Sequence, residues 1–264
     1  MPWGKFDATG AAVIPKIIIQ TWKTDDLPQR EQAFADGWKR LNPGFDYRLF
    51  DDAACEGLIA DAAPEFLPDY RAFPFPVMRA DFFRYAAIWA LGGVYADVDM
   101  ECLRPIAPLL ELGDAILSVE VSLTAARQRE LGYARPYQIA NCVFAARPRH
   151  PFMRAAMERC IELARARNGI ERRDIEDITG PRMLTRLFYE SPPAGVAVLR
   201  QIFLMPPRHY PAVWPIGGNF HARHHFLGSW KEHRPASLRR RWIERDLWPT
   251  PFPSAFVDPR PNGG

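Results

Sequence analysis

The sequence lacks several features that mark specialised classes of protein. None of its segments approaches the roughly 18 consecutive apolar residues of a membrane-spanning helix, and the first ten residues show no basic stretch followed by an apolar run. The formal net charge of +3 at pH 7 is too small to indicate nucleic-acid binding. We therefore expect a cytoplasmic protein with no nucleic-acid partner, for which peripheral contact with the inner face of the cytoplasmic membrane stays open.

Cysteine is scarce as well, with only Cys55, Cys102, Cys142 and Cys160. None of them forms a C-x-x-C pair, and three lie in apolar surroundings, which favours reduced, buried thiols over disulfides or a structural metal site. Proline, in contrast, is abundant: its 26 residues are about twice the average share of roughly 5%. The prolines cluster at 64–76, 192–215 and 249–261 and therefore mark loops and a tail.

The remaining composition is that of a globular protein, and 264 residues suffice for one large α/β domain. Short β-branched runs alternate with helical patterns, which predicts a single domain with a mostly parallel central sheet. The predicted strands are 13–20, 47–50, 94–96, 115–119, 138–145, 196–199 and 202–204, and the predicted helices are 30–41, 52–59, 78–91, 151–167 and 181–188. We expect an N-terminal extension at 1–12, a catalytic domain at 13–230 and a basic, proline-rich segment at 231–264.

The stretch from Met78 to Asp99 is the most informative part of the sequence. Residues 78–91 are apolar almost all round, and Gly92-Gly93 then supplies the left-handed cap that commonly ends a helix. A strand at 94–96 follows and leads directly to Asp97 and Asp99. Ligands of open α/β sheets bind outside the carboxyl ends of the strands, so we expect the chemistry at this point.

Asp97 and Asp99 form a D-x-D pattern, which alone is weak because solvated loop aspartates often show it. Carboxylates at i and i+2 of a strand point to the same face and can converge on one hard cation at the strand end. Close carboxylates next to buried residues repel each other unless a cation compensates them. The position therefore favours Mn²⁺ or Mg²⁺ with open coordination sites for phosphate oxygens.

Asp81 and Arg84 interrupt the apolar helix at i and i+3, where their side chains are neighbours. A structural ion pair is one interpretation. The other is that the pair contacts sugar hydroxyls or a phosphate, for which arginine is well suited.

Ordered motifs in the chain resemble glycosyltransferase family 32, the sugar-binding region containing a DXD motif. The similar segments are Ile14–Ile18 with Gln20–Trp22, Asn42-Pro43, Tyr47–Asp52, Arg79–Tyr85 and Gly92–Asp99. The family includes yeast initiating mannosyltransferases, inositol-phosphoceramide mannosyltransferases and bacterial surface-polysaccharide enzymes. The resemblance, which spans roughly 14–230, implies a GT-A-type fold and a retaining transfer from a UDP- or GDP-sugar.

The resemblance also implies roles for individual residues. Asp97 and Asp99 would bind the metal and the diphosphate, Asp81 and Arg84 would contact the donor sugar, and Tyr95 would lie near the sugar or the ribose. All four charged residues would therefore belong to the catalytic site.

Further donor-binding residues follow from the first strand and from the middle of the chain. Gln20, Thr21 and Trp22 would lie at the donor, with Trp22 stacked on the base, and Asn141 would face the transferred sugar. Thr179-Gly180-Pro181 matches a family block that would position the acceptor side.

The C-terminal part of the resemblance is a His…Gly-Ser-Trp block. His224 is our choice for the metal and diphosphate, with His225 as the alternative, and Ser229 and Trp230 complete the block. The family often has His where this chain has Ile19, so the contact near the donor at that position stays open.

The sequence therefore predicts a metal-dependent, retaining transfer of a hexose or N-acetylhexosamine to a glycan or lipid-linked acceptor, in bacterial surface-polysaccharide or glycolipid synthesis. A front-face attack and a covalent intermediate both stay open, because no carboxylate is identifiable as a nucleophile. The alternatives are a non-catalytic nucleotide-sugar or membrane-surface module and a haloacid-dehalogenase-like phosphatase. The basic segment 231–248 suits contact with anionic lipid, although the sequence favours a solvated helix face as the explanation.

Overall fold

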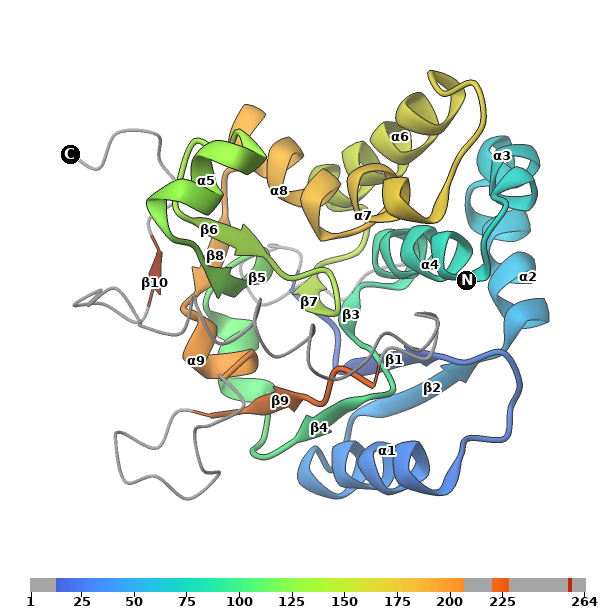
Figure 1. The fold of residues 1–264 in the computed structure, drawn as a ribbon. Helices are drawn as coiled ribbons and strands as arrows, with labels where there is room; N and C mark the ends of the chain where they lie inside the picture. Colours follow the sequence, from blue (N-terminus) through green and yellow to red (C-terminus); the bar gives the residue numbers. More distant parts are fainter. Residues whose placement is uncertain (1–12, 207–219, 228–255, 258–264) are drawn as a thin grey trace.

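The computed structural model describes residues 13–206, 220–227 and 256–257 (Figure 1). The strands within these ranges are β1 (Ile17–Thr21), β2 (Asp46–Phe50), β3 (Gly93–Ala96), β4 (Met100–Cys102), β5 (Ala115–Ser122), β6 (Tyr137–Ile139), β7 (Val143–Ala146), β8 (Val196–Leu199), β9 (Ala222–His224) and β10 (Phe256–Val257). The helices are α1 (Gln29–Leu41), α2 (Asp52–Ala62), α3 (Leu67–Ala72), α4 (Pro76–Leu91), α5 (Ala125–Leu131), α6 (Pro151–Arg165), α7 (Ile175–Ile178), α8 (Pro181–Glu190) and α9 (Gln201–Leu204).

A central sheet has the strand order β10-β8-β5-β7-β3-β1-β2, with β6 paired to β5. The strand pairings give β1, β2, β3, β5 and β8 one direction and β7 and β10 the opposite one. The predicted α/β fold with a mostly parallel sheet is therefore confirmed. Strand β3 lies between β1 and β7, in the interior of the sheet, so the residues that follow it emerge at the middle of its carboxyl edge.

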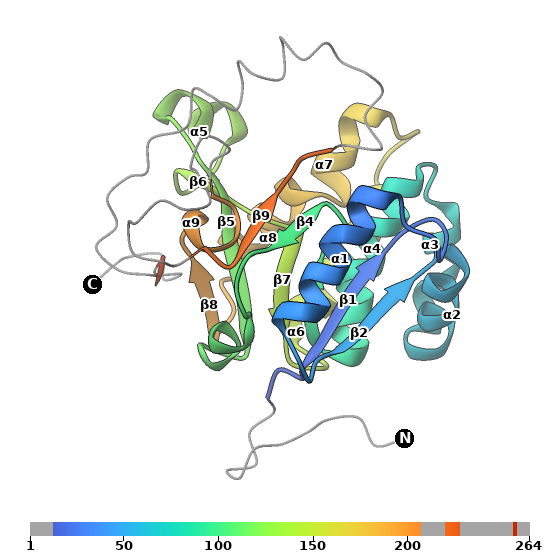
Figure 2. The same cartoon turned by 90° about the horizontal axis from the view of Figure 1, so that it is seen from below.

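Helices cover both faces of the sheet, as Figures 1 and 2 show. Successive side chains of each strand point to opposite faces, so one strand contributes to the cores on both sides. On one face Ile19 and Tyr95 join a core formed with α2, α4, α6 and α8. On the other face Ile18 and Val94 pack with Trp38 of α1. A second, two-stranded sheet of β4 and β9 lies next to α1 on this face (Figure 2).

Helix α4 is buried along nearly its whole length, as its apolar sequence predicts. It ends where Gly92 and Gly93 adopt φ angles of 67° and 99°, in the region that favours glycine. A Cβ on Gly93 would lie 2.6 Å from the carbonyl oxygen of Ile17. This glycine therefore lets the start of β3 approach β1 closely.

Two predictions of secondary structure are wrong. Residues 202–204, predicted as a strand, form part of helix α9, because Phe203 and Leu204 both point into the core beside β9. The predicted single strand 138–145 is two strands, β6 and β7, which pair with different parts of β5. The break between them places Asn141 in a loop at the carboxyl edge of the sheet.

The predicted extension 1–12 and most of segment 231–264 lie outside the described residues. Within that segment, Phe256 and Val257 pair with β8 as an edge strand. All four cysteines are buried and free of disulfides, as predicted. In the described part of the chain, no helix has the length and apolar character needed to cross a membrane.

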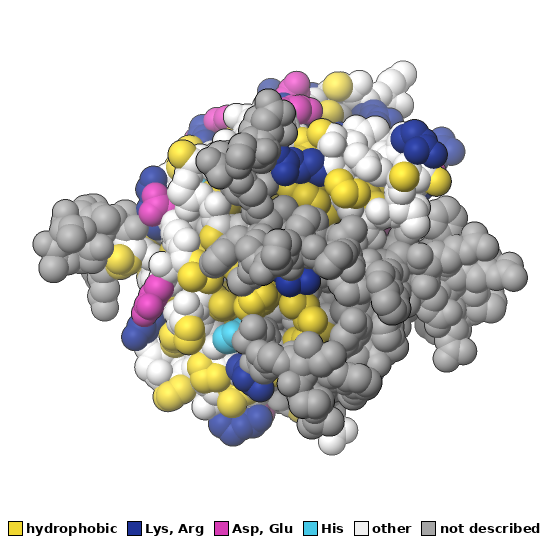
Figure 3. Space-filling view, turned by 90° about the vertical axis from the view of Figure 1, so that its left-hand side faces the viewer, with side chains coloured by type: hydrophobic (Ala, Val, Ile, Leu, Met, Phe, Trp, Pro, Cys, Tyr) yellow, Lys and Arg dark blue, Asp and Glu magenta, His cyan; other side chains and the backbone are white. Residues whose placement is uncertain are grey.

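Figure 3 shows the face of the molecule on the left-hand side of Figure 1. Lys and Arg side chains form separate small groups between hydrophobic side chains, and Asp and Glu lie mainly toward the upper and left edges of the view. This mixed distribution agrees with the small net charge of the sequence.

Candidate active site and metal centre

The backbone after β3 is fixed by a buried glutamine. Gln20, at the end of β1, is fully buried, and its Nε2 donates to the carbonyl oxygen of Asp97 at 3.1 Å. The hydroxyl of Tyr47 donates to Gln20 Oε1 at 2.6 Å. The N–H of Met100 donates to the same Asp97 carbonyl at 2.9 Å and closes a turn. Gln20 therefore fixes the backbone at Asp97 from within the protein, and its buried side chain is not accessible to a nucleotide-sugar.

Strand β9 brings a histidine to these aspartates from 125 residues further along the chain. In the β4–β9 ladder, His224 lies opposite Met100, and its Nε2 is 3.0 Å from Asp99 Oδ1. The N–H of Leu227 donates to Asp99 Oδ2 at 2.9 Å. Single ligand atoms of Asp97, Asp99 and His224 all lie within 4.8 Å of one another.

These three side chains fit a divalent cation. The two carboxylates supply the oxygen ligands that Mn²⁺ or Mg²⁺ prefers, the imidazole nitrogen favours the transition metal Mn²⁺, and three protein ligands leave coordination sites open for phosphate or water. Nδ1 of His224 is buried without a hydrogen-bond partner among the described residues. Nε2, the ring nitrogen that faces Asp99, is therefore the atom that a cation at this site would meet.

Burial and neighbouring charges act differently on the two aspartates. Burial raises the pKa of Asp97, and Asp99 raises it further, while the guanidinium of Arg84 opposes both. Burial alone would also raise the pKa of Asp99, but the hydrogen bonds from His224 and Leu227 together lower it below its usual value. A cation between the two carboxylates would remove their mutual repulsion, so the arrangement favours metal binding.

A buried network extends from Asp97 to α4. Arg84 NH2 lies 3.0 Å from Asp81 Oδ1 and 3.2 Å from Asp97 Oδ1, and Arg84 NH1 donates to the carbonyl of Asn141 at 2.8 Å. Asn141 Nδ2 and the hydroxyl of Thr179 donate to the two Asp81 oxygens at 3.1 and 2.9 Å. The helix spacing thus brings Asp81 and Arg84 together as predicted, and the fold adds Asn141 and Thr179.

The charges in this network are almost completely enclosed, with Asp81 and Arg84 only 4% and 5% exposed. Burial raises the pKa of Asp81 to about 6, although Arg84 and the hydrogen bond from Thr179 act in the opposite direction. Arg84 Nε is buried and has no hydrogen-bond partner within the described part of the chain. A buried, incompletely satisfied guanidinium is costly, so its retention beside Asp97 favours a role in binding a negatively charged group.

The other predicted donor residues lie in different positions. Tyr95 is buried, and its hydroxyl donates to Asp97 Oδ1 at 2.8 Å, so it supports the aspartate from within the sheet. The hydroxyl of Thr21 donates to the Phe50 carbonyl, toward β2. Trp22 is partly exposed and packs on Val98 and its neighbours, beside the D-x-D turn. Ser229 and Trp230 lie outside the described residues.

Ile19 and His225, which the sequence left open, have clear places in the structure. Ile19 is fully buried in the core on the α4 face of the sheet, so it does not line the D-x-D turn. His225 faces away from Asp99, toward Glu101 and Arg30. Glu101, Tyr47 and the Leu227 N–H are functional candidates that the sequence did not reveal, because the first is a common exposed residue type and the others act through long-range contacts.

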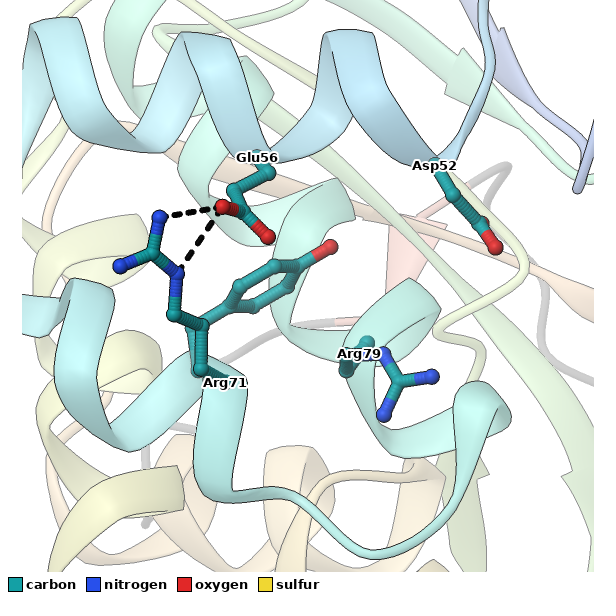
Figure 4. A pocket seen from close by; sticks show the side chains of 5 residues that line it. Asp52, Glu56, Arg71 and Arg79 are labelled. Atoms are coloured by element: carbon teal, nitrogen blue, oxygen red, sulfur yellow. Dashed lines mark hydrogen bonds and ion pairs between the residues drawn. The ribbon is translucent and has the colours of Figure 1, made fainter.

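A pocket elsewhere on the molecule contains none of the predicted site residues. It has a volume of about 250 Å³ and lies between α2, α3 and α4, where Asp52, Glu56, Tyr70, Arg71 and Arg79 line it (Figure 4). Arg71 Nε donates to Glu56 at 2.9 Å. The pocket is therefore distinct from the metal centre.

Comparison with known proteins identifies the region that carries the aspartates. Residues 28–120 match the family described as "Glycosyltransferase sugar-binding region containing DXD motif". This region of the chain is therefore similar to the DXD glycosyltransferase family. The matched region contains Asp81, Arg84, Asp97 and Asp99, whereas Asn141, Thr179 and His224 lie beyond it.

Fungal mannosyltransferases are similar to this protein over about half of the chain or more. Inositol phosphoceramide mannosyltransferase 2 of Schizosaccharomyces pombe is 35% identical over 146 residues, which are 55% of this chain and 38% of the relative. The initiation-specific alpha-1,6-mannosyltransferase of Candida albicans is 29% identical over 202 residues, 67% of this chain and 52% of the relative. The chain thus spans between about a third and a half of the length of these relatives.

Two solved glycosyltransferase structures are similar to this chain over most of its length. The galactosyltransferase LgtC in complex with donor and acceptor sugar analogs has a TM-score of 0.44 at 16% identity, covering 89% of this chain and 97% of LgtC. Mouse xyloside xylosyltransferase 1 has a TM-score of 0.47 at 11% identity, covering 80% and 97%.

Proposed function

We propose that this chain is a divalent-metal-dependent, retaining glycosyltransferase that transfers a hexose from a nucleotide-sugar to a hydroxyl group of a glycan or glycolipid. The observation that carries the proposal is the convergence of Asp97, Asp99 and His224 within 4.8 Å, next to the buried Asp81–Arg84 pair. GDP-mannose is the first donor to test, because the named fungal relatives are mannosyltransferases.

Each part of the site has a distinct task in this proposal. Asp97, Asp99 and His224 would hold Mn²⁺ or Mg²⁺, which when bound supplies positive charge to the leaving nucleoside diphosphate. Arg84 adds a fixed positive charge within 3.2 Å of Asp97, in a buried setting where water screens it little. Asp81 accepts from Arg84 and Asn141 at Oδ1 and from Thr179 at Oδ2, which leaves a lone pair of Oδ2 to accept from a sugar hydroxyl.

The arrangement of hydrogen bonds also prepares the site in advance of binding. Gln20 and Tyr95 fix the backbone and one carboxylate oxygen of Asp97, so this aspartate needs little rearrangement when the donor binds. Trp22, beside Val98, offers an aromatic surface for the nucleotide base. Attack by the acceptor on the anomeric carbon would proceed through an oxocarbenium-like state, by a front-face path or through a covalent intermediate.

The test is a panel of nucleotide-sugars, GDP-mannose, UDP-glucose, UDP-galactose and UDP-N-acetylglucosamine, incubated with the purified chain and Mn²⁺. Glycolipid, glycan and bacterial polysaccharide acceptors are added in separate reactions, and release of nucleoside diphosphate is followed. We expect turnover with one donor, and a loss of at least about a hundredfold for Asp99→Asn. Asp69→Asn, which removes only a surface pair with Arg165, serves as the matched control.

Three results would contradict the proposal. Full turnover in excess chelator would exclude the metal role, and inversion of the anomeric centre in the product would exclude retention. Binding of a nucleotide-sugar without turnover against any acceptor would instead support a non-catalytic binding module.

The basic segment 231–248 lies outside the described residues, so its contact with a membrane stays a prediction.

A further inference from the structure

His225, directly after the proposed metal ligand His224, is held by side chains from two separate elements. Its Nε2 lies 2.9 Å from Glu101 Oε2 on β4, and its Nδ1 lies 3.0 Å from Arg30 NH2 on α1. Its ring stacks on Phe34, also on α1, with the ring centres 4.5 Å apart and an interplanar angle of 23°. Both ring nitrogens and one ring face are therefore engaged.

The partners of the two ring nitrogens determine which tautomer of the ring is present. A guanidinium only donates, so Nδ1 of His225 accepts the hydrogen bond from Arg30. Nε2 then carries the hydrogen and donates to the carboxylate of Glu101. The contacts thus select one tautomer and one orientation of the ring.

The backbone around His225 connects this cluster to Asp99. The His225 N–H donates to the Asp99 carbonyl at 3.0 Å, and Leu227 N–H donates to Asp99 Oδ2 at 2.9 Å. Between them Phe226 adopts a φ of 50°, uncommon for a residue with a side chain, and its ring lies 4.0 Å from that of His224. The chain therefore reverses direction here so that His224 and the Leu227 N–H meet the same carboxylate.

Strand β9 alone provides little support for this geometry. It has three residues and, among the described strands, pairs only with the three-residue β4, outside the central sheet. Short two-stranded ribbons are marginally stable without further packing. Trp38 of α1 packs on this ribbon through the Met100 carbonyl, and the contacts of His225 with α1 add a second attachment at the end of β9, next to Asp99.

We propose that His225, held by Arg30, Phe34 and Glu101, is a positioning residue. It places His224 and the Leu227 N–H against Asp99 and so orients the third ligand of the divalent-cation site. The proposal rests on the metal site of the proposed function. It assigns to the first turns of α1 a role in cation affinity, although no residue of α1 would touch the cation.

The first experiment measures Mn²⁺ affinity of the full chain by electron paramagnetic resonance titration. We expect His225→Ala and Phe34→Ala to weaken binding by about tenfold, the lower end of the range for residues that orient metal ligands. Phe34→Tyr keeps the stacked ring and should restore affinity to within about twofold. Arg40→Ala, an exposed residue of the same helix, is the matched control. Unchanged Mn²⁺ affinity in His225→Ala and Phe34→Ala would overturn the proposal.

A second measurement needs neither the cation nor turnover. Hydrogen exchange at the Leu227 amide reports its bond to Asp99 in the metal-free protein. We expect exchange to accelerate at least about tenfold in Phe34→Ala, while the Tyr95 amide in the core strand β3 keeps its protection. Protection of Leu227 equal to that of the unsubstituted protein would overturn the positioning role. If no nucleotide-sugar is turned over while Leu227 and Mn²⁺ affinity respond as expected, the proposed function fails and this inference stands.

Discussion

Asp81 shows how a single buried carboxylate is tuned by its neighbours. Burial raises its pKa to about 6, and the hydrogen bond from Thr179, together with Arg84, limits that rise. The ionised form is the one that pairs with Arg84 and accepts from a sugar hydroxyl. The fraction of protein with a competent Asp81 therefore increases as the pH rises through about 6.

The activity of the protein with saturating Mn²⁺ should consequently fall below pH 6. Thr179→Val removes a hydrogen bond that favours the ionised carboxylate, so the pKa of Asp81 rises and the midpoint of kcat/KM against pH should move upward by about one unit. Thr185→Val is the matched control, since Thr185 is equally buried but bonds to Pro181 and Ile139 instead of Asp81. A midpoint that stays in place in Thr179→Val, or moves as far in Thr185→Val, would contradict this assignment.

At the scale of elements, the junction of α4 and β3 determines where the aspartates emerge. The helix is predictable from its apolar sequence and the double glycine, and its bounds differ from the expected 78–91 by only two residues. The close approach of β3 to β1 depends on Gly93, which has no room for a Cβ. This approach also places Gln20 of β1 within hydrogen-bond distance of Asp97.

Gly93→Ala should destabilise the protein by roughly 3 kcal/mol or more, because it adds backbone strain at a φ of 99° to a clash with the Ile17 backbone. Gly57→Ala lies in the interior of α2, where the new Cβ would meet no atom within 4 Å apart from the nearby backbone of its own helix, and it should stabilise by about 0.5–1 kcal/mol. Urea unfolding of the two variants gives both values. Equal stability of the two variants would show that the contact between β1 and β3 leaves room for a Cβ at position 93.

At the scale of the whole molecule, the candidate site joins six segments that are distant in sequence. They are the end of β1, the body of α4, the turn after β3, the β6–β7 loop, the end of α7 and strand β9. A cation held between β3 and β9 would therefore connect the central sheet to the separate β4–β9 sheet. Binding of the cation should stabilise the folded chain as a whole.

Thermal unfolding with and without Mn²⁺ checks this expectation. At free Mn²⁺ about a hundredfold above its Kd, the free energy of unfolding should rise by about 2.7 kcal/mol, which corresponds to several degrees in Tm. The Asp97→Asn, Asp99→Asn double variant should lose this shift in stability, whereas Asp36→Asn, at an exposed position of α1, should keep it. A Tm that does not respond to Mn²⁺ in the unsubstituted protein would count against the metal centre.

The sequence by itself determined the α/β class, the buried helix with Asp81 and Arg84, and the strand that ends at Asp97. These features depend on local signals: hydrophobic periodicity, a double-glycine stop, and charges in an otherwise apolar run. The predicted strand at 202–204 is wrong because local signals are ambiguous there: a short apolar run does not distinguish a strand from a buried helical turn.

Only the tertiary structure decided what each side chain faces. It directs Gln20 and Tyr95 at Asp97 from within the protein, buries Ile19 away from the site, and separates the tasks of two adjacent histidines. His224 reaches Asp99, while His225 lies between Phe34, Arg30 and Glu101. Adjacent residues in a sequence carry no information about which strand or helix will pack on each of them, since those partners lie more than a hundred residues away.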